Sequence, residues 1–453
     1  MHIHILGICG TFMAGIAALA KAHGHKVTGC DQNVYPPMST QLEQLDIKIT
    51  EGYNSNQIEI KPDLFIIGNV ITRGNPLIES ILNQKLKYQS GPQWLYENIL
   101  HNKWVLAVAG THGKTSTTAM LAWILEANGL APGFLIGGIP NNFNVSARLP
   151  ISSNKNSPTF FVIEADEYDT AFFDKRSKFI HYHPNTLILN NLEFDHADIF
   201  ENIEHIEKHF HHLIRTIPNI GKIIFNNDSL SIKKVLKQGC WSEIEDFGPM
   251  GKWAYQKINE NEFEVYFQEK SQGIVKWDLI GHHNAQNALA AIAASKHVGI
   301  PSDKSISALG KFKNVKKRME LLESTRGINI YDDFAHHPTA IKTTLEGLRS
   351  KIGKDRIVAI IEPRSNTMKL GKMKDDLLKS LKEADIIFCF SKNLSWDPRI
   401  LFKNIPNVTV MKDIDILANK IFDSCQPNDN IIFMSNGGFS GLQNKLIQLL
   451  KNE

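Results

Sequence analysis

Short apolar runs and longer segments with helical spacing alternate along the whole chain. The runs are rich in isoleucine, valine, leucine and phenylalanine, and tight turns followed by amphipathic stretches separate most of them. Alternation of this kind is typical of parallel sheets flanked by helices, so the pattern predicts an α/β fold. The predicted strands occupy residues 2–6, 26–29, 64–68, 104–109, 160–164, 186–189, 222–225, 328–331, 357–361, 385–390 and 431–434.

These elements group into three blocks, and a length of 453 residues also predicts about three domains. In the central block, Phe263, Val265 and Phe267 alternate with polar residues, so we expect antiparallel strands to extend its sheet into a mixed one. The polar segment 97–103 is predicted to be the linker that precedes this block. The expected domains are an N-terminal Rossmann-like domain (1–103), a central P-loop ATPase-type domain (104–314) and a C-terminal Rossmann-like domain (315–453).

Composition excludes several classes of protein. Lys and Arg number 50 against 47 Asp and Glu, which gives a net charge of +3, and 42% of the residues are hydrophobic. No basic run exceeds residues 316–318, and no apolar stretch reaches the roughly 18 to 20 residues that a membrane span needs. The five cysteines form no CxxC pair. We therefore expect a cytoplasmic protein with neither nucleic-acid nor membrane partners.

The strongest chemical signal is a glycine-rich loop between a predicted strand and a predicted helix. Backbone N–H groups at a helix N-terminus bind phosphate, a lysine reaches the terminal phosphates and the next hydroxyl holds Mg²⁺. Lys114 and Thr115 occupy these positions, although Val108 stands where the full GxxxxGK[ST] pattern has its first glycine. The predicted phosphate-binding residues are Gly110, Thr111, His112, Gly113, Lys114, Thr115 and Ser116.

Acidic residues follow the next predicted strand of the central block, at Glu164, Asp166, Glu167 and Asp169. An aspartate and a histidine, Asp195-His196, come after the strand that follows. A magnesium-nucleotide site needs oxygen ligands at such strand ends. The predicted metal ligands are Thr115, Glu164 and His196.

The segment 7–15 near the N-terminus resembles a dinucleotide fingerprint, but Cys9 and Phe12 stand where its second and third glycines belong. A nicotinamide site is therefore not expected. The N-terminus of a helix after a strand still suits a diphosphate, and Asp31 at the end of the next strand is a candidate acceptor for a ribose hydroxyl. A tight turn with a purely structural role is the alternative.

Together these residues resemble the Mur ligase family, the ATP-dependent enzymes that build the peptide of bacterial cell-wall precursors. The family's loop ends in GKT[ST], and its central domain carries an acidic strand end and an Asp-His pair, as in this chain at Glu164 and Asp195-His196. Residues 281–287, Gly-His-His-Asn-Ala-Gln-Asn, are similar to the family's adenine-contacting GxHNxxN pattern. Arg318-Met319 is similar to the segment that carries the family's arginine, and Asp333, within residues 332–338, is similar to its ribose-binding aspartate.

The resemblance implies that ATP and Mg²⁺ are cofactors and that Lys114, His196 and Arg318 act in catalysis. Several relatives carry a carbamylated lysine near a second metal; this chain has His211 there, so a second magnesium would need other ligands. The implied contacts are His283, Asn287, Arg318 and Asp333 for the adenosine, Gly7, Gly10, Thr11, Met13 and Asp31 for a UDP-sugar, and His336, Arg364, Asn366, Asn436 and Gly437 for a peptide.

Two substrates remain open within the family. The N-terminal stretch and the His-His-Pro motif resemble the branch that uses UDP-N-acetylmuramate, to which one enzyme adds L-alanine in de novo synthesis and another adds the murein tripeptide L-alanyl-γ-D-glutamyl-meso-diaminopimelate in recycling. Segments 195–200, 362–369 and 434–439 resemble the recycling enzyme. The expected reaction is therefore ATP-dependent amide formation with the tripeptide through an acyl phosphate, and the L-alanine reaction is the alternative.

Proteins of other classes share such a phosphate loop. A small-molecule kinase would bind nucleotide with similar residues, and so would a regulator without turnover. Because the loop and Arg318 fall in different predicted domains, we expect closure of the C-terminal domain to complete the site.

Overall fold

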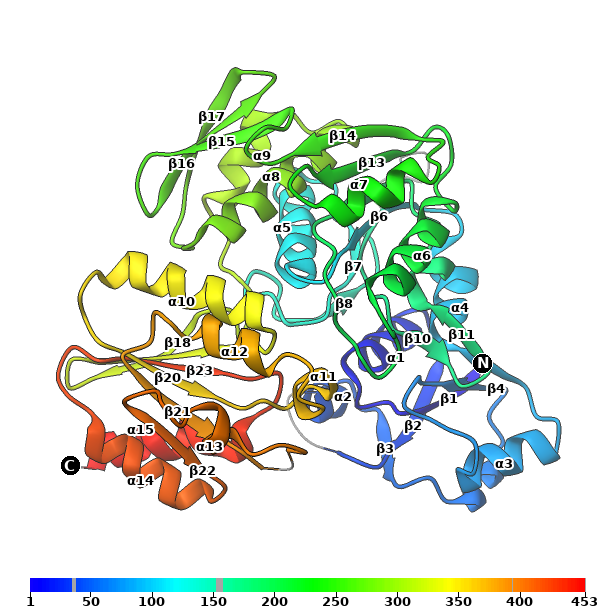
Figure 1. Cartoon of the computed structure of the whole chain (residues 1–453). Helices are drawn as coiled ribbons and strands as arrows, with labels where there is room; N and C mark the ends of the chain where they lie inside the picture. Colours follow the sequence, from blue (N-terminus) through cyan, green and yellow to red (C-terminus); the bar gives the residue numbers. More distant parts are fainter. Residues whose placement is uncertain (35–37, 152–157, 393, 453) are drawn as a thin grey trace.

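The computed structural model describes residues 1–34, 38–151, 158–392 and 394–452, which form three α/β units in chain order (Figure 1). Each unit is built on one main sheet, of five, ten and six strands respectively. The predicted α/β class, with Rossmann-like outer units and a mixed central sheet, is confirmed.

The N-terminal unit has a parallel sheet in the order β3-β2-β1-β4-β5. Its central strand is buried along most of its length because helices cover both faces of the sheet. The strands are β1 (His2–Leu6), β2 (Lys26–Asp31), β3 (Lys48–Glu51), β4 (Leu64–Ile67) and β5 (Tyr88–Ser90). The helices are α1 (Thr11–Ala22), α2 (Met38–Gln44), η1 (Ser55–Ile60), α3 (Pro76–Asn83), α4 (Gly91–Leu95) and the π-helical turn η2 (Tyr96–Leu100).

The central unit has a sheet in the order β17-β16-β15-β14-β13-β12-β6-β9-β7-β8. Strands β14 to β7 in this order are parallel, whereas β15, β16 and β17 pair antiparallel, as their alternating pattern predicts. The strands are β6 (Trp104–Ala109), β7 (Gly133–Leu135), β8 (Ala147–Arg148), β9 (Phe160–Ala165), β12 (Thr186–Leu189), β13 (Lys222–Asn226), β14 (Glu243–Phe247), β15 (Trp253–Lys257), β16 (Glu262–Phe267) and β17 (Lys270–Lys276), with a separate hairpin of β10 (Asp169–Ala171) and β11 (Asp174–Ser177). The helices are α5 (Lys114–Ala127), η3 (Lys178–His181), α6 (Ile203–Ile214), α7 (Leu230–Lys237), α8 (His282–His297) and α9 (Ser302–Leu309).

The C-terminal unit has a sheet in the order β18-β19-β23-β20-β21-β22, in which only the edge strand β18 is antiparallel. The strands are β18 (Glu320–Thr325), β19 (Ile328–Asp333), β20 (Ile357–Ile361), β21 (Ile386–Phe390), β22 (Val408–Met411) and β23 (Asn430–Met434). The helices are α10 (Pro338–Ile352), α11 (Asn366–Lys369), α12 (Lys374–Ser380), α13 (Pro398–Leu401), α14 (Ile414–Ser424), η4 (Phe439–Gly441) and α15 (Leu442–Asn452).

The predicted linker at 97–103 is wrong for its first half. The chain is helical as far as Leu100, and both Ile99 and Leu100 are buried. These two apolar side chains pack into a core although the residues around them in the sequence are polar, because burial of apolar side chains is favourable. The connection to the central unit is therefore short and anchored at its start.

The N-terminal and central units share one apolar core, whereas the C-terminal unit has its own. The shared cluster runs from Ile3 and Trp94 to Phe161 and beyond. Helix α1 lies so close to the central sheet that a Cβ added to Gly15 would lie 3.0 Å from Leu135. Two separate clusters cover the two faces of the C-terminal sheet. The first two units are therefore expected to behave as one body.

None of the helices in the described part of the chain combines the length and apolar composition that a bilayer crossing requires.

Replacing one core residue in each body tests this division. Trp94→Ala empties a fully buried site of the shared core, and Leu446→Ala does the same in the C-terminal unit. We expect losses of about 3–5 and about 2–5 kcal/mol in unfolding free energy, respectively. Hydrogen exchange should show that Trp94→Ala raises exchange in β1 and β6 alike, and that Leu446→Ala raises it only beyond residue 320. Exchange confined to the N-terminal unit in Trp94→Ala would contradict a shared core.

Candidate active site

The glycine-rich loop joins β6 to α5 in a conformation that only glycine adopts easily. Gly110 and Gly113 have φ angles of +139° and +79°. A Cβ on Gly113 would also lie 2.6 Å from Oδ1 of Asn287. Among the described residues no side chain caps the first turn of α5, so its N–H groups remain available to an anion.

Lys114 lies beside the loop in a buried ionic network. Its side chain is 11% exposed, and its ammonium donates to Oε2 of Glu167 at 2.9 Å and to the carbonyl of Gly110 at 2.7 Å. The other oxygen of Glu167 lies 3.3 Å from Nε2 of His196. Burial alone would lower the pKa of Lys114 and of His196, but neighbouring carboxylates, Glu167 foremost, outweigh it and raise both pKa values. The network therefore favours the charged form of each group.

Thr115 links the loop to two other parts of the chain. Its hydroxyl donates to Oε1 of Glu164 at 3.0 Å and accepts from Nη2 of Arg318 at 3.3 Å. The N–H of Gly137 donates to the other oxygen of Glu164 at 2.6 Å. Arg318 thus already reaches the phosphate loop across the two units.

The predicted metal ligands fall into two neighbouring groups. Thr115 and Glu164 bond to each other, whereas His196 lies with Asp166 and Glu167, and these three offer ligand atoms within 4.8 Å of one another. Burial raises the pKa of Glu164. The acidic run after β9 was the signal for the group around His196, but spacing did not distinguish Glu167 from its neighbours.

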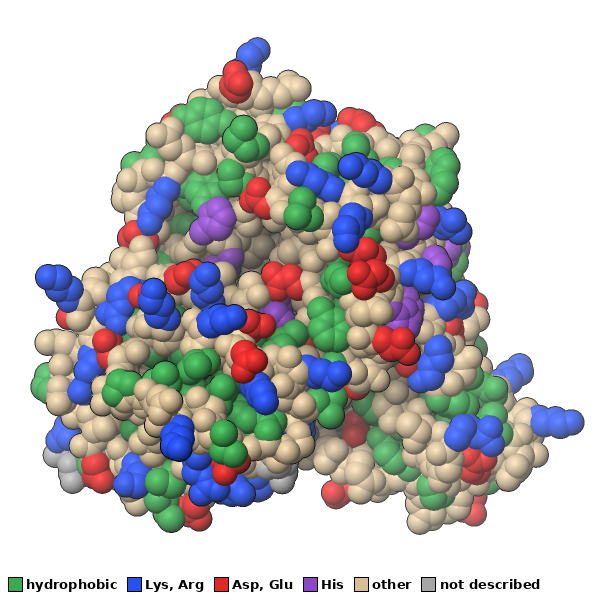
Figure 2. Space-filling view, viewed as in Figure 1, with side chains coloured by type: hydrophobic (Ala, Val, Ile, Leu, Met, Phe, Trp, Pro, Cys, Tyr) green, Lys and Arg blue, Asp and Glu red, His purple; other side chains and the backbone are tan. Residues whose placement is uncertain are grey.

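A cavity of about 550 Å³ opens beside the loop, between the central and C-terminal units. Figure 2 shows a hollow between these units with histidine side chains at its edge. Helix α10 covers one side and the start of α8 the other. The cavity brings together seven residues predicted to contact ATP: His112, Gly113, Ser116, His283, Asn287, Arg318 and Asp333.

Buried polar groups shape this cavity. Asp333 accepts the N–H groups of Met319 and Ala335, each at 2.8 Å, which holds the turn that carries Arg318. The Arg318 guanidinium lies over the Phe334 ring, 4.9 Å from its centre. Burial raises the pKa of Asp333 and lowers that of His283 to about 4, so the imidazole is neutral at pH 7.

The candidate peptide-binding residues gather at one edge of the C-terminal sheet. Strands β20 and β23 are parallel neighbours in which Ile361 pairs with Met434, so the loops after them lie side by side. A Cβ on Gly437 would collide with the Arg364 side chain, and Nζ of Lys317 donates to the Gly437 carbonyl at 2.9 Å. Oδ1 of Asn436, the residue before Gly437, is buried without a hydrogen-bond partner among the described residues.

This edge also contacts the central unit. Nδ2 of Asn366 donates to Asp198 at 2.9 Å, and the Thr367 hydroxyl donates to Asp195 at 3.0 Å. The half-buried ring of His336 lies 3.0 Å from the Phe334 carbonyl through Nδ1, and desolvation lowers its pKa to about 4. Asn366, one of the peptide candidates, therefore lies next to the segment that carries Asp195 and His196.

The N-terminal candidates form a tight turn. Gly7 has φ +76°, Gly10 precedes the first residue of α1, Thr11, and the N–H of Cys9 donates to the buried carboxylate of Asp31 at 2.9 Å. Both alternatives from the sequence therefore remain compatible with the geometry. A UDP-sugar site at this turn stays a prediction.

Two other residues singled out in the sequence lie in packed surroundings. The side chain of Met13 is buried and packs beside Gly91 in the shared core. His211 is buried on α6, where its ring stacks near Trp241 at 6.3 Å between centres. It is not among the metal-type groups found in the described residues.

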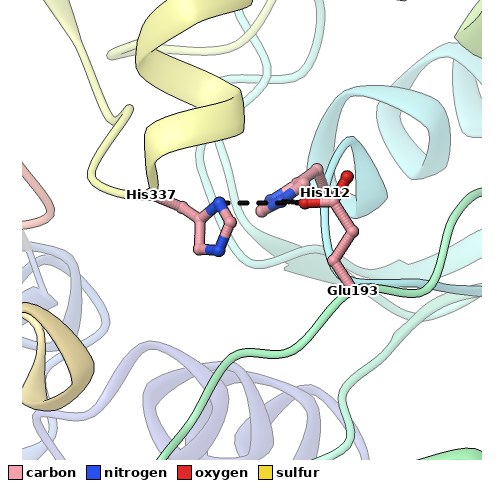
Figure 3. Close-up of side chains that lie close together, drawn as sticks. All are labelled: His112, Glu193 and His337. Carbon is pink, nitrogen blue, oxygen red and sulfur yellow. Dashed lines mark hydrogen bonds and ion pairs between the residues drawn. The ribbon is translucent and has the colours of Figure 1, made fainter. Parts of the chain in front are cut away.

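The sequence analysis missed a contact between the phosphate loop and the C-terminal unit. Oε2 of Glu193 lies 3.1 Å from Nε2 of His112 and accepts the Thr339 hydroxyl at 2.7 Å. Figure 3 shows His337 facing the same carboxylate. Glu193 lies shortly after β12, and Glu164 lies at the end of β9. This position near the end of a strand was the feature of the sequence that could have marked Glu193 as a site residue.

Three family models match the chain in order. They are the Mur ligase family catalytic domain over residues 2–103, the Mur ligase middle domain over 108–295 and the Mur ligase glutamate ligase domain over 317–437. The chain is also 52% identical, over 99% of its length and 98% of its relative's, to the UDP-N-acetylmuramate–L-alanyl-γ-D-glutamyl-meso-2,6-diaminoheptandioate ligase of Escherichia coli K12. The chain belongs to the Mur ligase family.

Other Mur ligases agree along their whole length. The Haemophilus influenzae ligase of the same name is 50% identical over 99% of both chains. The crystal structure of a murein peptide ligase from Psychrobacter arcticus is 44% identical and covers 100% of this chain and 99% of that one, with a TM-score of 0.79. The resemblance inferred from the motifs is therefore confirmed.

Two glycine substitutions separate the role of the phosphate loop in this Mur ligase from mere backbone strain. Gly113 and Gly129 have nearly the same φ, +79° and +78°, but a Cβ on Gly129 meets nothing within 4 Å. We expect Gly113→Ala to weaken ATP binding at least tenfold because Asn287 and the loop must shift. The matched control Gly129→Ala should lose only stability, by about 1 kcal/mol. Equal ATP affinity in both variants, measured by calorimetry, would contradict this assignment.

Proposed function

We propose that this protein is an ATP-dependent ligase that joins UDP-N-acetylmuramate to the tripeptide L-alanyl-γ-D-glutamyl-meso-diaminopimelate in murein recycling. The observation that carries the proposal is the 52% identity, over 99% of the chain, to the Escherichia coli ligase named for this reaction. The described geometry supplies what the reaction needs: a phosphate loop, a nucleotide-sized cavity and an adjacent polar edge on the C-terminal sheet.

In the proposed division of labour, residues 1–103 bind the UDP-sugar, 104–314 bind ATP and 315–453 bind the incoming peptide. Gly7, Gly10, Thr11, Met13 and Asp31 are the proposed UDP-sugar residues, and His336, Arg364, Asn366, Asn436 and Gly437 the proposed peptide residues. The proposed location is the cytoplasm, where ATP and UDP-sugars are available.

ATP would lie with its phosphates on residues 110–116 and its adenosine in the cavity. The phosphates would replace Glu167 as the main partner of Lys114, whose ammonium lies at the start of α5. His283 and Asn287 would contact the adenine, and Asp333 and Arg318 would lie towards the ribose and the phosphates. The neutral state of His283 suits it to hydrogen bonding with an uncharged base.

The residues at the strand ends fit Mg²⁺. The hydroxyl of Thr115 and the carboxylates of Glu164, Asp166 and Glu167 are hard oxygen donors that converge beside the phosphate loop. Of these, we propose Thr115 and Glu164 as ligands of the ion that accompanies ATP. His196 is proposed as a further ligand, and it would have to lose the proton that Glu167 stabilises before it could bind the ion. When bound, Mg²⁺ neutralises charge on the phosphates.

The reaction would proceed in two displacements. An oxygen of the lactyl carboxylate attacks the γ-phosphorus and ADP leaves, which forms an acyl phosphate. The amine of the peptide then attacks the acyl carbon, and inorganic phosphate leaves as the amide forms. Lys114 and Arg318 would stabilise the charge that gathers on the transferred phosphoryl group, which is an electrostatic and positional contribution.

Phosphate release tests the reaction and its substrate. With ATP, Mg²⁺ and UDP-N-acetylmuramate, we expect release on addition of the tripeptide and not on addition of free L-alanine. Lys114→Ala should reduce kcat about 10²- to 10³-fold because a charge aimed at the transferred group is removed. Release with L-alanine alone would favour the de novo ligase, and release without any amine would favour a kinase.

Substitution of Arg364 tests the peptide site. An arginine bonded to a carboxylate contributes about 1.5–3 kcal/mol, so Arg364→Ala should raise KM for the tripeptide about ten- to hundredfold and leave KM for ATP unchanged. Arg399→Ala is the matched control, because Arg399 is an exposed arginine of the same unit that pairs with Asp397. An unchanged tripeptide KM in Arg364→Ala would remove Arg364 from the site.

A further inference from the structure

Two histidines and a glutamate meet where the phosphate loop touches the C-terminal unit (Figure 3). His112 comes from the loop before α5, Glu193 from the segment after β12, and His337 from the residue that precedes α10. Nε2 of His112 lies 3.1 Å and Nδ1 of His337 lies 3.9 Å from the same oxygen of Glu193. The three ligand atoms all lie within 4.8 Å of one another.

The hydrogen bonds around His337 leave two acceptors facing each other. Nδ1 of His337 accepts the N–H of Thr339 at 3.3 Å, so Nδ1 is the ring nitrogen without a proton, and a metal ion at Nδ1 would replace this long hydrogen bond. Burial lowers the pKa of His337 to about 4, and the pKa of Glu193 is held near 2 because its partners, His112 first, outweigh its burial. A neutral imidazole nitrogen and a carboxylate oxygen, which also accepts the Thr339 hydroxyl at 2.7 Å, therefore lie 3.9 Å apart with no proton between them, and a cation placed there could be bound by both.

The donor set indicates the class of cation. Two imidazoles and one carboxylate suit zinc and similar transition metals, whereas magnesium sites are built mainly from oxygen ligands, as in the pair Thr115 and Glu164. Ligand atoms of a tetrahedral zinc lie about 3.3 Å apart, given bonds of about 2.0–2.1 Å. The distances of 3.1 and 3.9 Å are close to that spacing. His112 and Glu193 also line the large cavity, which leaves room for a water as a fourth ligand.

We propose that His112, Glu193 and His337 form a binding site for zinc or a related transition-metal ion that joins the phosphate loop to the C-terminal unit. The site is distinct from the proposed magnesium ligands Thr115, Glu164 and His196. Because its ligands come from two units, the bound ion holds α10 against the central unit and opposes opening of the nucleotide cavity.

Cobalt provides a direct test, since its visible absorption reports ligand number and geometry. The full-length protein, without a histidine tag and freed of metal by a chelator, is titrated with Co²⁺ alone. We expect one equivalent to give the strong visible bands of a four- or five-coordinate ion, and zinc to displace it. His337→Asn keeps a side chain that caps α10 but removes the imidazole, and should weaken Co²⁺ binding at least a hundredfold.

A matched substitution at the other metal-type group keeps the test specific. His196→Asn removes the imidazole that lies with Asp166 and Glu167, and should leave the Co²⁺ spectrum unchanged. Hydrogen exchange should slow at the start of α10 when zinc is added to the wild-type protein, but not to His337→Asn. An unchanged spectrum in His337→Asn, or its loss in His196→Asn, would overturn the proposal. Neither readout needs turnover, so the result is independent of the proposed ligase reaction.

Discussion

The buried ammonium of Lys114 is the constraint around which the rest of the site is arranged. A lysine that is 11% exposed keeps its charge only if an opposite charge lies against it, and Glu167, itself 3% exposed, supplies that charge. Glu167 in turn is held by His196, which follows β12 on the other side of β6. Because β6, β9 and β12 are parallel neighbours, all three groups come from the same edge of one sheet. In the proposed reaction, an incoming phosphate would therefore meet a lysine that is already desolvated beside the start of α5.

The two contacts between units differ in kind. The N-terminal and central units are joined by apolar side chains. Separating these units would expose apolar surface to water, which is unfavourable in free energy. The C-terminal unit meets the central one through polar pairs such as Thr339 with Glu193 and Asn366 with Asp198. Polar pairs can exchange for water at little net loss, so this second contact is the one suited to opening and closing. The nucleotide cavity lies at that contact.

Much of the fold followed from local patterns, and the least predictable parts depend on contacts between distant segments. The strands from residues 2–6 to 431–434 were recognisable because each is a short run of buried apolar residues, and the phosphate loop because its glycines need positive φ. The linker at 97–103 was mispredicted because the burial of Leu100 depends on a neighbouring unit. Likewise, no local signal joins Glu193 to Thr339, which lie 146 residues apart in the chain. His283, Arg318 and Asp333 meet around one cavity although they come from different units, and only the family resemblance, not a local pattern, indicated that grouping.

The protonation states of the buried histidines bear on how the proposed reaction handles charge. It brings a carboxylate, a triphosphate and an anionic peptide together, yet His283, His336 and His337 all have pKa values lowered to about 4 by burial. They add no positive charge at pH 7, so compensation falls on other groups, among them Lys114, Arg318, Arg364 and the proposed Mg²⁺. Lys114 lies on the central unit, whereas Arg318 and Arg364 belong to the C-terminal segment. The negative charge of the substrates is therefore fully compensated only when the central and C-terminal units are together. The substrates' own charge thus favours closure of the polar contact between these two units.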